Sequence, residues 1–433
     1  MPFQIDHGIL RVYEEEPGVT AVTVPDEVRQ IAAGAFGTCT ELTRITLPDG
    51  LEVIGRGAFE DCVRLTQLEL PAGVTAIGKG AFADCFNLET LTIPPGVTRI
   101  EPELCRGCRR LRRVTLPDGL AVIGAGAFRE CVSLTSIRLP EGIDEIGADA
   151  FHGCERLRTV TLPRTLLRIG DLAFVQCGEL VLDALPARVK RIGVGAFREC
   201  IRLTEMRLPE GIIELSPYAF YGCSGLRTVT LPERLMLIEA GAFCGCTSLT
   251  DIQIPLCVTS IGPIAFAQCE SLTALDLPPG LHSIAANAVC GCPSLRTYRC
   301  KGQTYQIPPF VRTFSENWQA VVFHALWSGS VPDDLTRQAR CAVAAALFCT
   351  GCDLPWLRAV LRTEAVRILR FLTIHNDAKG VRQMLDSGVC FSKRDLYVCV
   401  HAAQEAAAKE CYVLLLDALE ARGAFADPRG PRL

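Results

Sequence analysis

Cysteine is the residue type with the widest chemical reach in this chain, which contains 23 of them. Two pairs have the C-x-x-C spacing found in metal and redox sites, namely Cys105 with Cys108 and Cys349 with Cys352. A structural zinc ion needs four ligands, and neither pair has a second pair at a matching place. We therefore expect no metal, and metal analysis of the purified protein would decide the alternative of a zinc or redox centre.

Most of the other cysteines stand in one regular series with a step of 23 residues. The series runs through Cys39, Cys62, Cys85, Cys108, Cys131, Cys154, Cys177, Cys200, Cys223, Cys246, Cys269 and Cys292. Such spacing indicates a ladder of small buried side chains whose S–H groups donate weak bonds to backbone carbonyls. Adjacent rungs would have parallel Cβ vectors, which suits disulfides poorly, so we expect all 23 thiols to be free.

Other motifs of catalysis are incomplete or absent from the sequence. The triplets at 55–57, 78–80 and 124–126 imitate a phosphate-binding loop but lack the third glycine and the following helix. Six scattered histidines form no H-E-x-x-H motif, and no G-x-S-x-G occurs. We expect no enzyme activity and no cofactor; an enzyme within residues 310–425 is an alternative without motif support.

The cysteine period extends to other residue types, and it defines the elements that position them. A phenylalanine precedes most of the cysteines by three residues, and a leucine follows each by three. Within the consensus L-T-x-I-x-L-P-x-G-V-x-x-I-G-x-x-A-F-x-x-C, Leu42, Ile45 and Leu47 have the spacing of a short strand, which the next proline ends. One coil cannot bury this face alone, so we predict about twelve stacked coils with a parallel β-sheet.

Three coils depart from the consensus. Cys105 and Val289 replace the phenylalanine, so we expect a smaller side chain to fill these two coils and a looser coil there. Asp183 stands where the middle inward residue of a strand belongs. Because an unpaired buried carboxylate is costly, a shifted or bulged strand is favoured over a paired, buried Asp183.

This 23-residue pattern resembles the BspA-type leucine-rich repeats, and the resemblance covers about two thirds of the chain. It implies a curved solenoid used for binding proteins or host surfaces, and it identifies no ligand.

The chain ends suggest caps and a second domain. Phe3, Ile5, Leu10 and Val12 alternate around Asp6-His7-Gly8, which predicts a capping hairpin at 1–18, followed by the solenoid at 19–307. A second hairpin is expected at 298–307. Amphipathic helices are expected near 333–350, 354–375, 378–387 and 393–422, in a smaller all-α domain at 308–425. The segment 377–388 resembles part of an ankyrin repeat, and 426–433 is predicted to be a flexible tail.

Net charge and hydropathy limit the classes of partner and the cellular compartments that we expect. The net charge is −4 with an isoelectric point near 6.0, which gives no electrostatic reason to expect nucleic acid. No segment has the roughly 20 uncharged apolar residues of a membrane-spanning helix, and the N-terminus lacks the pattern of a secretory signal. We expect a cytoplasmic protein; a secreted or cell-surface adhesin, exported by a signal outside this sequence, is the alternative that cell fractionation would test.

Two surfaces are candidates for binding a protein partner of unknown identity. The exposed positions of the predicted sheet carry mixed charges and no aromatic residue, and the candidate contact residues there are Arg44, Glu69, Arg113, Arg138, Glu205, Arg207, Asp251 and Asp276. On the opposite wall an apolar patch is expected from Leu167, Ile213, Met236 and Leu237, either for a partner or for the helical domain. The function that follows is a non-enzymatic interaction scaffold.

Overall fold

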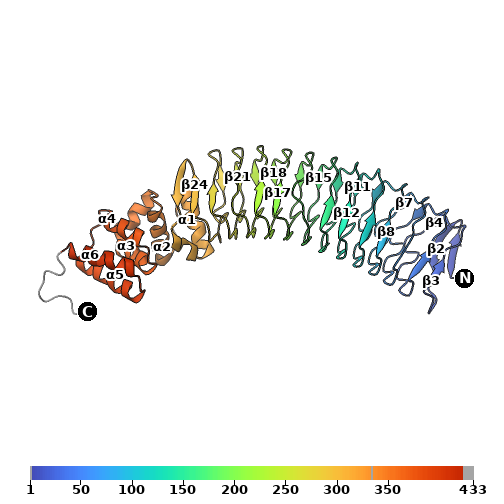
Figure 1. Cartoon of the computed structure of the whole chain (residues 1–433), viewed down its shortest axis with the longest axis horizontal. Coiled ribbons are helices and arrows are strands. Elements are labelled where there is room, and N and C mark those ends of the chain that lie inside the picture. The colour runs from blue at the N-terminus through green and yellow to red at the C-terminus, as the bar shows by residue number, and fades with distance from the viewer. Residues whose placement is uncertain (1, 333–334, 423–433) are drawn as a thin grey trace. The chain divides into compact units, whose positions relative to one another are not determined.

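Most coils contain the strand that the L-x-x-I-x-L segment predicts, and these strands run parallel in the expected register. In the computed structural model, which describes residues 2–332 and 335–422, Val22 pairs with Ile45, and Ile137 with Val160. The central residue is buried while its neighbours on both sides are exposed. The described residues form a parallel-sheet solenoid of about 13 turns of roughly 23 residues, followed by six helices, which confirms the predicted fold class (Figure 1).

The chain divides into two compact units, residues 1–270 with 280–283, and residues 271–279 with 284–433. The strands of the predicted sheet are β3 (Ala21–Thr23), β5 (Arg44–Thr46), β8 (Thr90–Thr92), β10 (Arg113–Thr115), β12 (Ser136–Arg138), β14 (Thr159–Thr161), β17 (Glu205–Arg207), β19 (Thr228–Thr230), β22 (Ala274–Asp276) and β24 (Thr297–Cys300). The first eight lie in the first unit and the last two in the second.

A second wall of each coil is also extended, which the sequence did not reveal. Its two-residue strands are β4 (Gln30–Ile31), β6 (Val53–Ile54), β7 (Ala76–Ile77), β9 (Arg99–Ile100), β11 (Val122–Ile123), β13 (Glu145–Ile146), β15 (Arg168–Ile169), β16 (Arg191–Ile192), β18 (Glu214–Leu215), β20 (Leu237–Ile238), β21 (Ser260–Ile261) and β23 (Ser283–Ile284). Parallel pairing in this wall connects β9 through β16 as one five-stranded sheet. The isoleucine or leucine that ends V-x-x-I therefore both fills the core and pairs with the adjacent coils as part of a second sheet.

Aromatic rings and thiols fill the interior as two ladders. The phenylalanines are at most 1% exposed, and consecutive rings such as Phe174, Phe197 and Phe220 stack with centroids 5.4 Å apart. Each ladder thiol from Cys62 to Cys269 donates to a carbonyl 26 residues earlier, at sulfur–oxygen distances from 3.0 to 3.3 Å. All 23 cysteines are free thiols, as expected.

Both kinds of predicted irregularity are present. The phenylalanine stack runs from Phe36 to Phe82, is interrupted at the fully buried Cys105, and resumes at Phe128. In the coil of Asp183 the side chain is exposed, and only an isolated bridge between Ala184 and Arg207 replaces the strand. The strand is interrupted because a carboxylate left in the apolar interior would lose its hydration.

The third side of each coil is a series of tight turns, and the glycine triplets at 55–57, 78–80 and 124–126 lie in these turns. Gly57, Gly80 and Gly126 have φ between 56° and 62°, the left-handed region that glycine occupies without a steric penalty. The residue before each ladder cysteine has the same conformation, and it is not always glycine: Thr38 has φ of 64°. The fold tolerates the positive φ of Thr38 because its backbone N–H donates a hydrogen bond to the carbonyl of Glu60 in the next coil at 2.8 Å.

An antiparallel hairpin precedes the first coil. Strands β1 (Phe3–Asp6) and β2 (Ile9–Tyr13) pair around His7 and Gly8, and β2 continues in parallel onto β4. A register shift lies between Gln4 and Ile5. Val12 is 43% exposed, so the predicted alternation fails there, whereas Tyr13 is buried and stacks on Phe36 at 5.2 Å.

The second unit begins with strands and continues with helices. Strand β24 pairs in parallel with β22 and antiparallel with β25 (Gln303–Gln306), which forms the second predicted hairpin around Lys301 and Gly302. The helices are η1 (Pro309–Thr313), α1 (Glu316–Ser328), α2 (Arg337–Cys349), α3 (Pro355–Ile374), α4 (Ala378–Asp386), α5 (Lys393–Glu405) and α6 (Lys409–Glu420). The tail predicted at 426–433 lies outside the described residues.

The prediction of one helix over 393–422 is wrong. Helices α5 and α6 are separated by a turn in which Ala407 has φ of 52° and Ala408 donates to the carbonyl of Ala403 at 2.9 Å. The turn between α3 and α4 has the same geometry, with Asn376 at φ of 51°. The sequence indicates only the turn between α3 and α4, because asparagine favours a positive φ and alanine does not.

Candidate binding surface

The outer face of the solenoid sheet displays the predicted charged residues along its strands. Arg44, Arg113 and Glu205 begin β5, β10 and β17, whereas Arg138 and Arg207 end β12 and β17. All five are exposed, because each flanks a buried central residue. The strand geometry thus presents these charges to solvent in two columns, as predicted.

The other three predicted residues lie in less regular places. Glu69 is exposed, two residues after Gln67, which forms only isolated bridges. Asp251 is exposed and accepts a hydrogen bond from Gln253 at 3.3 Å. Asp276 ends β22 in the second unit and forms an ion pair of 2.5 Å with Arg299. Asp276 is therefore already compensated within the chain.

Most of the sheet charges have no such compensation. Among the residues that the structure describes, Arg44, Arg113, Arg138, Glu205 and Arg207 form no ion pair. Exposed charges of this kind remain hydrated. They are available to a partner at the cost of their hydration alone, without breaking an internal bond.

Two hollows on this face bring some of the predicted residues together. The first is about 580 Å³ and is lined by Arg113, Ser136, Arg138 and Thr159, among others. It lies where the strand pairs β8–β10 and β12–β14 meet, since these pairs are hydrogen-bonded separately. The second is about 510 Å³ and contains Arg44 and Glu69. We refer to the first as the Arg113–Arg138 hollow.

The predicted apolar patch is only partly assembled. Ile213 and Met236 are 54% and 48% exposed, and the N–H of Met236 donates to the carbonyl of Ile213 at 2.9 Å. Leu237 follows in β20 and is half-buried. Leu167 lies two coils earlier, with the coil of Lys190 between it and the others. Three of the four predicted residues therefore form one patch, and Leu167 does not join it.

Sequence reasoning missed an aromatic cluster on the turn side. Tyr218 is 38% exposed, and its ring occupies the space above Gly241 in the next coil. Its ring centroid is 5.9 Å from that of Tyr221, over which the guanidinium of Arg198 lies at 5.0 Å. The signal was present, because Tyr218 replaces a glycine of the column that contains Gly57 and Gly126.

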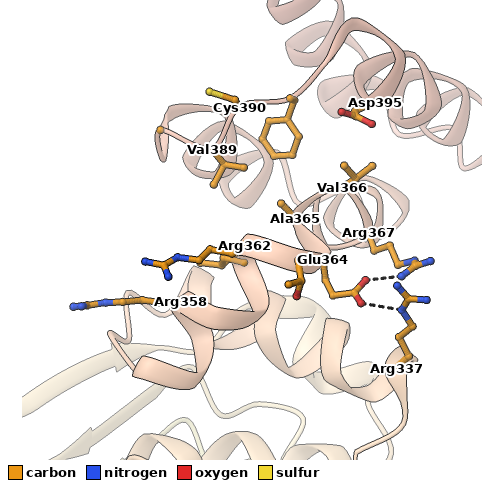
Figure 2. A pocket seen from close by; sticks show the side chains of 14 residues that line it. Arg337, Arg358, Arg362, Glu364, Ala365, Val366, Arg367, Val389, Cys390 and Asp395 are labelled. Carbon is orange, nitrogen blue, oxygen red and sulfur yellow. Dashed lines mark hydrogen bonds and ion pairs between the residues drawn. The ribbon is translucent and has the colours of Figure 1, made fainter.

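The helical unit contains a further hollow, of about 860 Å³, that no motif indicated (Figure 2). Glu364 on α3 accepts hydrogen bonds from Arg337 at 2.8 Å and Arg367 at 2.6 Å. Burial alone would raise the pKa of the Glu364 carboxyl, but the two arginines outweigh it and hold that pKa below its usual value. Arg358 is paired with Asp353. The charges of this hollow are thus largely neutralised by the chain itself.

Thiols and carboxylates do not assemble into a metal site in the described part of the chain, where no group of three or more potential ligands could hold an ion. Cys349 donates to the carboxylate of Asp377 at 3.5 Å, and burial raises the pKa of its thiol. No described helix is long and apolar enough to span a membrane.

Comparison with known proteins is consistent with this architecture. The family model for the BspA type leucine rich repeat region matches residues 11–131, 121–236 and 190–317. A leucine-rich repeat protein from Bacteroides ovatus is similar at 31% identity and a TM-score of 0.55, over 65% of this chain and 78% of that one. A leucine rich cell surface protein from Faecalibacterium prausnitzii shows 29% identity and a TM-score of 0.44, over 66% and 80%. No protein of curated function matches the chain.

Proposed function

Because the chain belongs to the BspA-type leucine-rich repeat family, whose members are generally surface or interaction proteins, we propose that it is a non-enzymatic scaffold that binds a protein partner through the outer face of its solenoid sheet. The observation that carries this proposal is the set of exposed, uncompensated charges at Arg44, Arg113, Arg138, Glu205 and Arg207.

Physical considerations favour a protein as the partner. The strands present a regular surface with mixed charge and many threonine hydroxyls, and steering by such charges determines which partner binds and how fast. Sugars and nucleic-acid bases usually stack on aromatic rings, and the two exposed columns of the sheet have none. An enzyme also has no motif in its favour, since the sequence contains no complete catalytic motif.

The test compares variants on two walls of adjacent coils. The full chain captures partners from native lysate, and the affinity of the partner so identified is then measured for Glu205→Lys/Arg207→Glu. We expect at least a tenfold loss, because two exposed charges change sign at the contact. Lys190→Glu on the second wall is the matched control and should bind normally. Equal binding by all three proteins would refute the sheet face as the binding surface.

We further propose that the scaffold acts in the cytoplasm, supported by its 23 free thiols. A column of thiols that donate to backbone carbonyls suits a reducing compartment, because disulfides persist mainly in oxidising ones. Cell fractionation tests this proposal, and recovery of the chain in the secreted or surface fraction would support the adhesin alternative.

A further inference from the structure

The Arg113–Arg138 hollow is the place where the sheet face is both recessed and positively charged. We propose that it binds the carboxylates of an acidic, extended segment of the partner, with acidic residues at alternate positions. This inference rests on the proposed function and specifies the chemistry of the partner at one site.

Positive charge is concentrated in the three coils around this hollow. The stretches 108–117, 131–140 and 154–163 together contain seven arginines and one acidic residue, Glu155, although the whole chain has a net charge of −4. The corresponding stretches of the adjacent coils, 85–94 and 177–186, carry only acidic charges. The basic region is therefore a local feature of three coils and is bounded on both sides.

The two arginines at the hollow remain available to a partner. Among the described residues neither Arg113 nor Arg138 forms an ion pair. The one carboxylate that lines the hollow, Asp118, lies in the turn after the strand. A planar guanidinium can bind a carboxylate with two parallel hydrogen bonds, and the hydroxyls of Ser136 and Thr159 line the same hollow to complete a polar site.

The register of the strands defines the spacing of the acidic groups. Arg113 begins β10, and Arg138 ends the adjacent strand β12, so the two are diagonal neighbours on the face. Diagonal neighbours on hydrogen-bonded strands lie about 7–8 Å apart; since β10 and β12 are not hydrogen-bonded to each other, the two Cα atoms lie at least that far apart, and the long arginine side chains span the remainder. Alternate residues of an extended segment are about 6.6 Å apart on one side. A segment with glutamates two positions apart therefore matches the arginine pair, whereas adjacent glutamates would point to opposite sides.

Nucleic acid is the less suitable polyanion for this site. Single strands are generally held by stacking their bases on aromatic rings, and none occurs in the two strand columns. The exposed ring of Phe86 is already covered by the guanidinium of Arg109, 5.4 Å from its centroid. The recess itself is also lined by short hydroxyl side chains.

The experiment measures fluorescence anisotropy of labelled peptides with the full chain. One peptide has glutamates at alternate positions, a second has them adjacent in the same number, and a third has glutamine in their place. We expect the first to bind most tightly, and Arg113→Ala/Arg138→Ala to weaken it about 2- to 30-fold, as for two exposed ion pairs. The matched control Arg168→Ala/Arg191→Ala, which removes two exposed arginines from the second wall, should bind like the unchanged protein. Unaltered circular dichroism and urea midpoints show that both variants are folded.

Four results would overturn the inference: no binding of the alternating peptide, equal binding of the glutamine peptide, equal loss in the control variant, or tighter arginine-dependent binding of a mixed-sequence DNA strand. These results are distinguishable from failure of the proposed function. If Glu205→Lys/Arg207→Glu abolishes capture of the native partner while the acidic peptide does not bind, only the inference about the hollow is wrong.

Discussion

The phenylalanine of each coil has a role that depends on its two neighbours. Phe197 is fully buried and lies between the rings of Phe174 and Phe220, with both centroid distances 5.4 Å. Removing this ring leaves a cavity that touches three coils. The surrounding walls are hydrogen-bonded from coil to coil, so they can collapse only partly.

We therefore predict that Phe197→Ala lowers the free energy of unfolding by about 3–5 kcal/mol. Urea unfolding followed by circular dichroism measures the change. Val194→Ala, in the same coil but 37% exposed, is the control and should cost far less. An effect of Phe197→Ala as small as that of the control would show that the stack contributes little.

Backbone strain is a second property of single residues. Thr38 has φ of 64°, although β-branched side chains rarely adopt this conformation, and Gly245 occupies the equivalent place with φ of 74°. Thr38 is exposed, and no side-chain hydrogen bond of it is recorded among the described residues. Relief of the strain should exceed the entropy that glycine adds to the unfolded chain.

Thr38→Gly is accordingly predicted to stabilise the protein by about 0.5–1 kcal/mol. The reverse substitution, Gly245→Thr, should destabilise it by at least as much, because a Cβ there meets only ordinary contacts with Gly222 and the cost is conformational. Thermal unfolding of the two variants gives the comparison. Destabilisation by Thr38→Gly would contradict this explanation.

At the scale of the elements, the sheet is not uniform, and the departures have local causes. The strand is lost at Asp183, while the coils on both sides retain theirs. Leu180 and Leu185 of this coil remain buried. The apolar framework of this coil is therefore intact, and Asp183 is the residue that departs from it.

Asp183→Val should restore a continuous strand and raise the free energy of unfolding by about 1–2 kcal/mol, the value of burying one such side chain. The measurement is the urea midpoint, with Asp251→Val as the control at an already exposed position. If both substitutions have the same effect, the carboxylate is not the cause of the interruption.

The sequence predicts the first strand of each coil, the buried ladders and both hairpins because the 23-residue period reports the same environment many times. The second strand column was missed, since its two residues are too few for an alternating pattern. The break at Ala407 was missed because three alanines favour a helix. The charged columns could be read from the sequence, but the hollows could not, because they depend on where strand pairs separate.

At the scale of the whole molecule, the thiol ladder links stability to pH. Burial raises the pKa of Cys223 to about 12, and burial together with the charge of Glu15 raises that of Cys39 to about 12, from an ordinary value of 9.0. Burial also raises the pKa of Cys177 and Cys200 well above that value. The unfolded chain thus loses these protons at a lower pH than the folded one.

The contribution of the ladder is fully present below about pH 9 and is lost as the pH rises toward about 12, because the folded state retains protons that the unfolded state releases. We predict that the urea midpoint falls steeply over this interval. Cys200→Ala/Cys223→Ala should fall less steeply than the unchanged protein, which separates the thiols from tyrosine and lysine. Parallel pH profiles would exclude the ladder as the cause.

The equal length of the coils has a consequence for how such a gene can change. In most coils the turn backbone and the ladder thiol bond the adjacent coil 22 to 26 residues away, so the regular coils present matching ends. Unequal recombination between repeats of the coding sequence can remove or add whole coils and still leave each junction bonded. The number of coils, and with it the set of outward-facing charges, can vary without the invention of a new core.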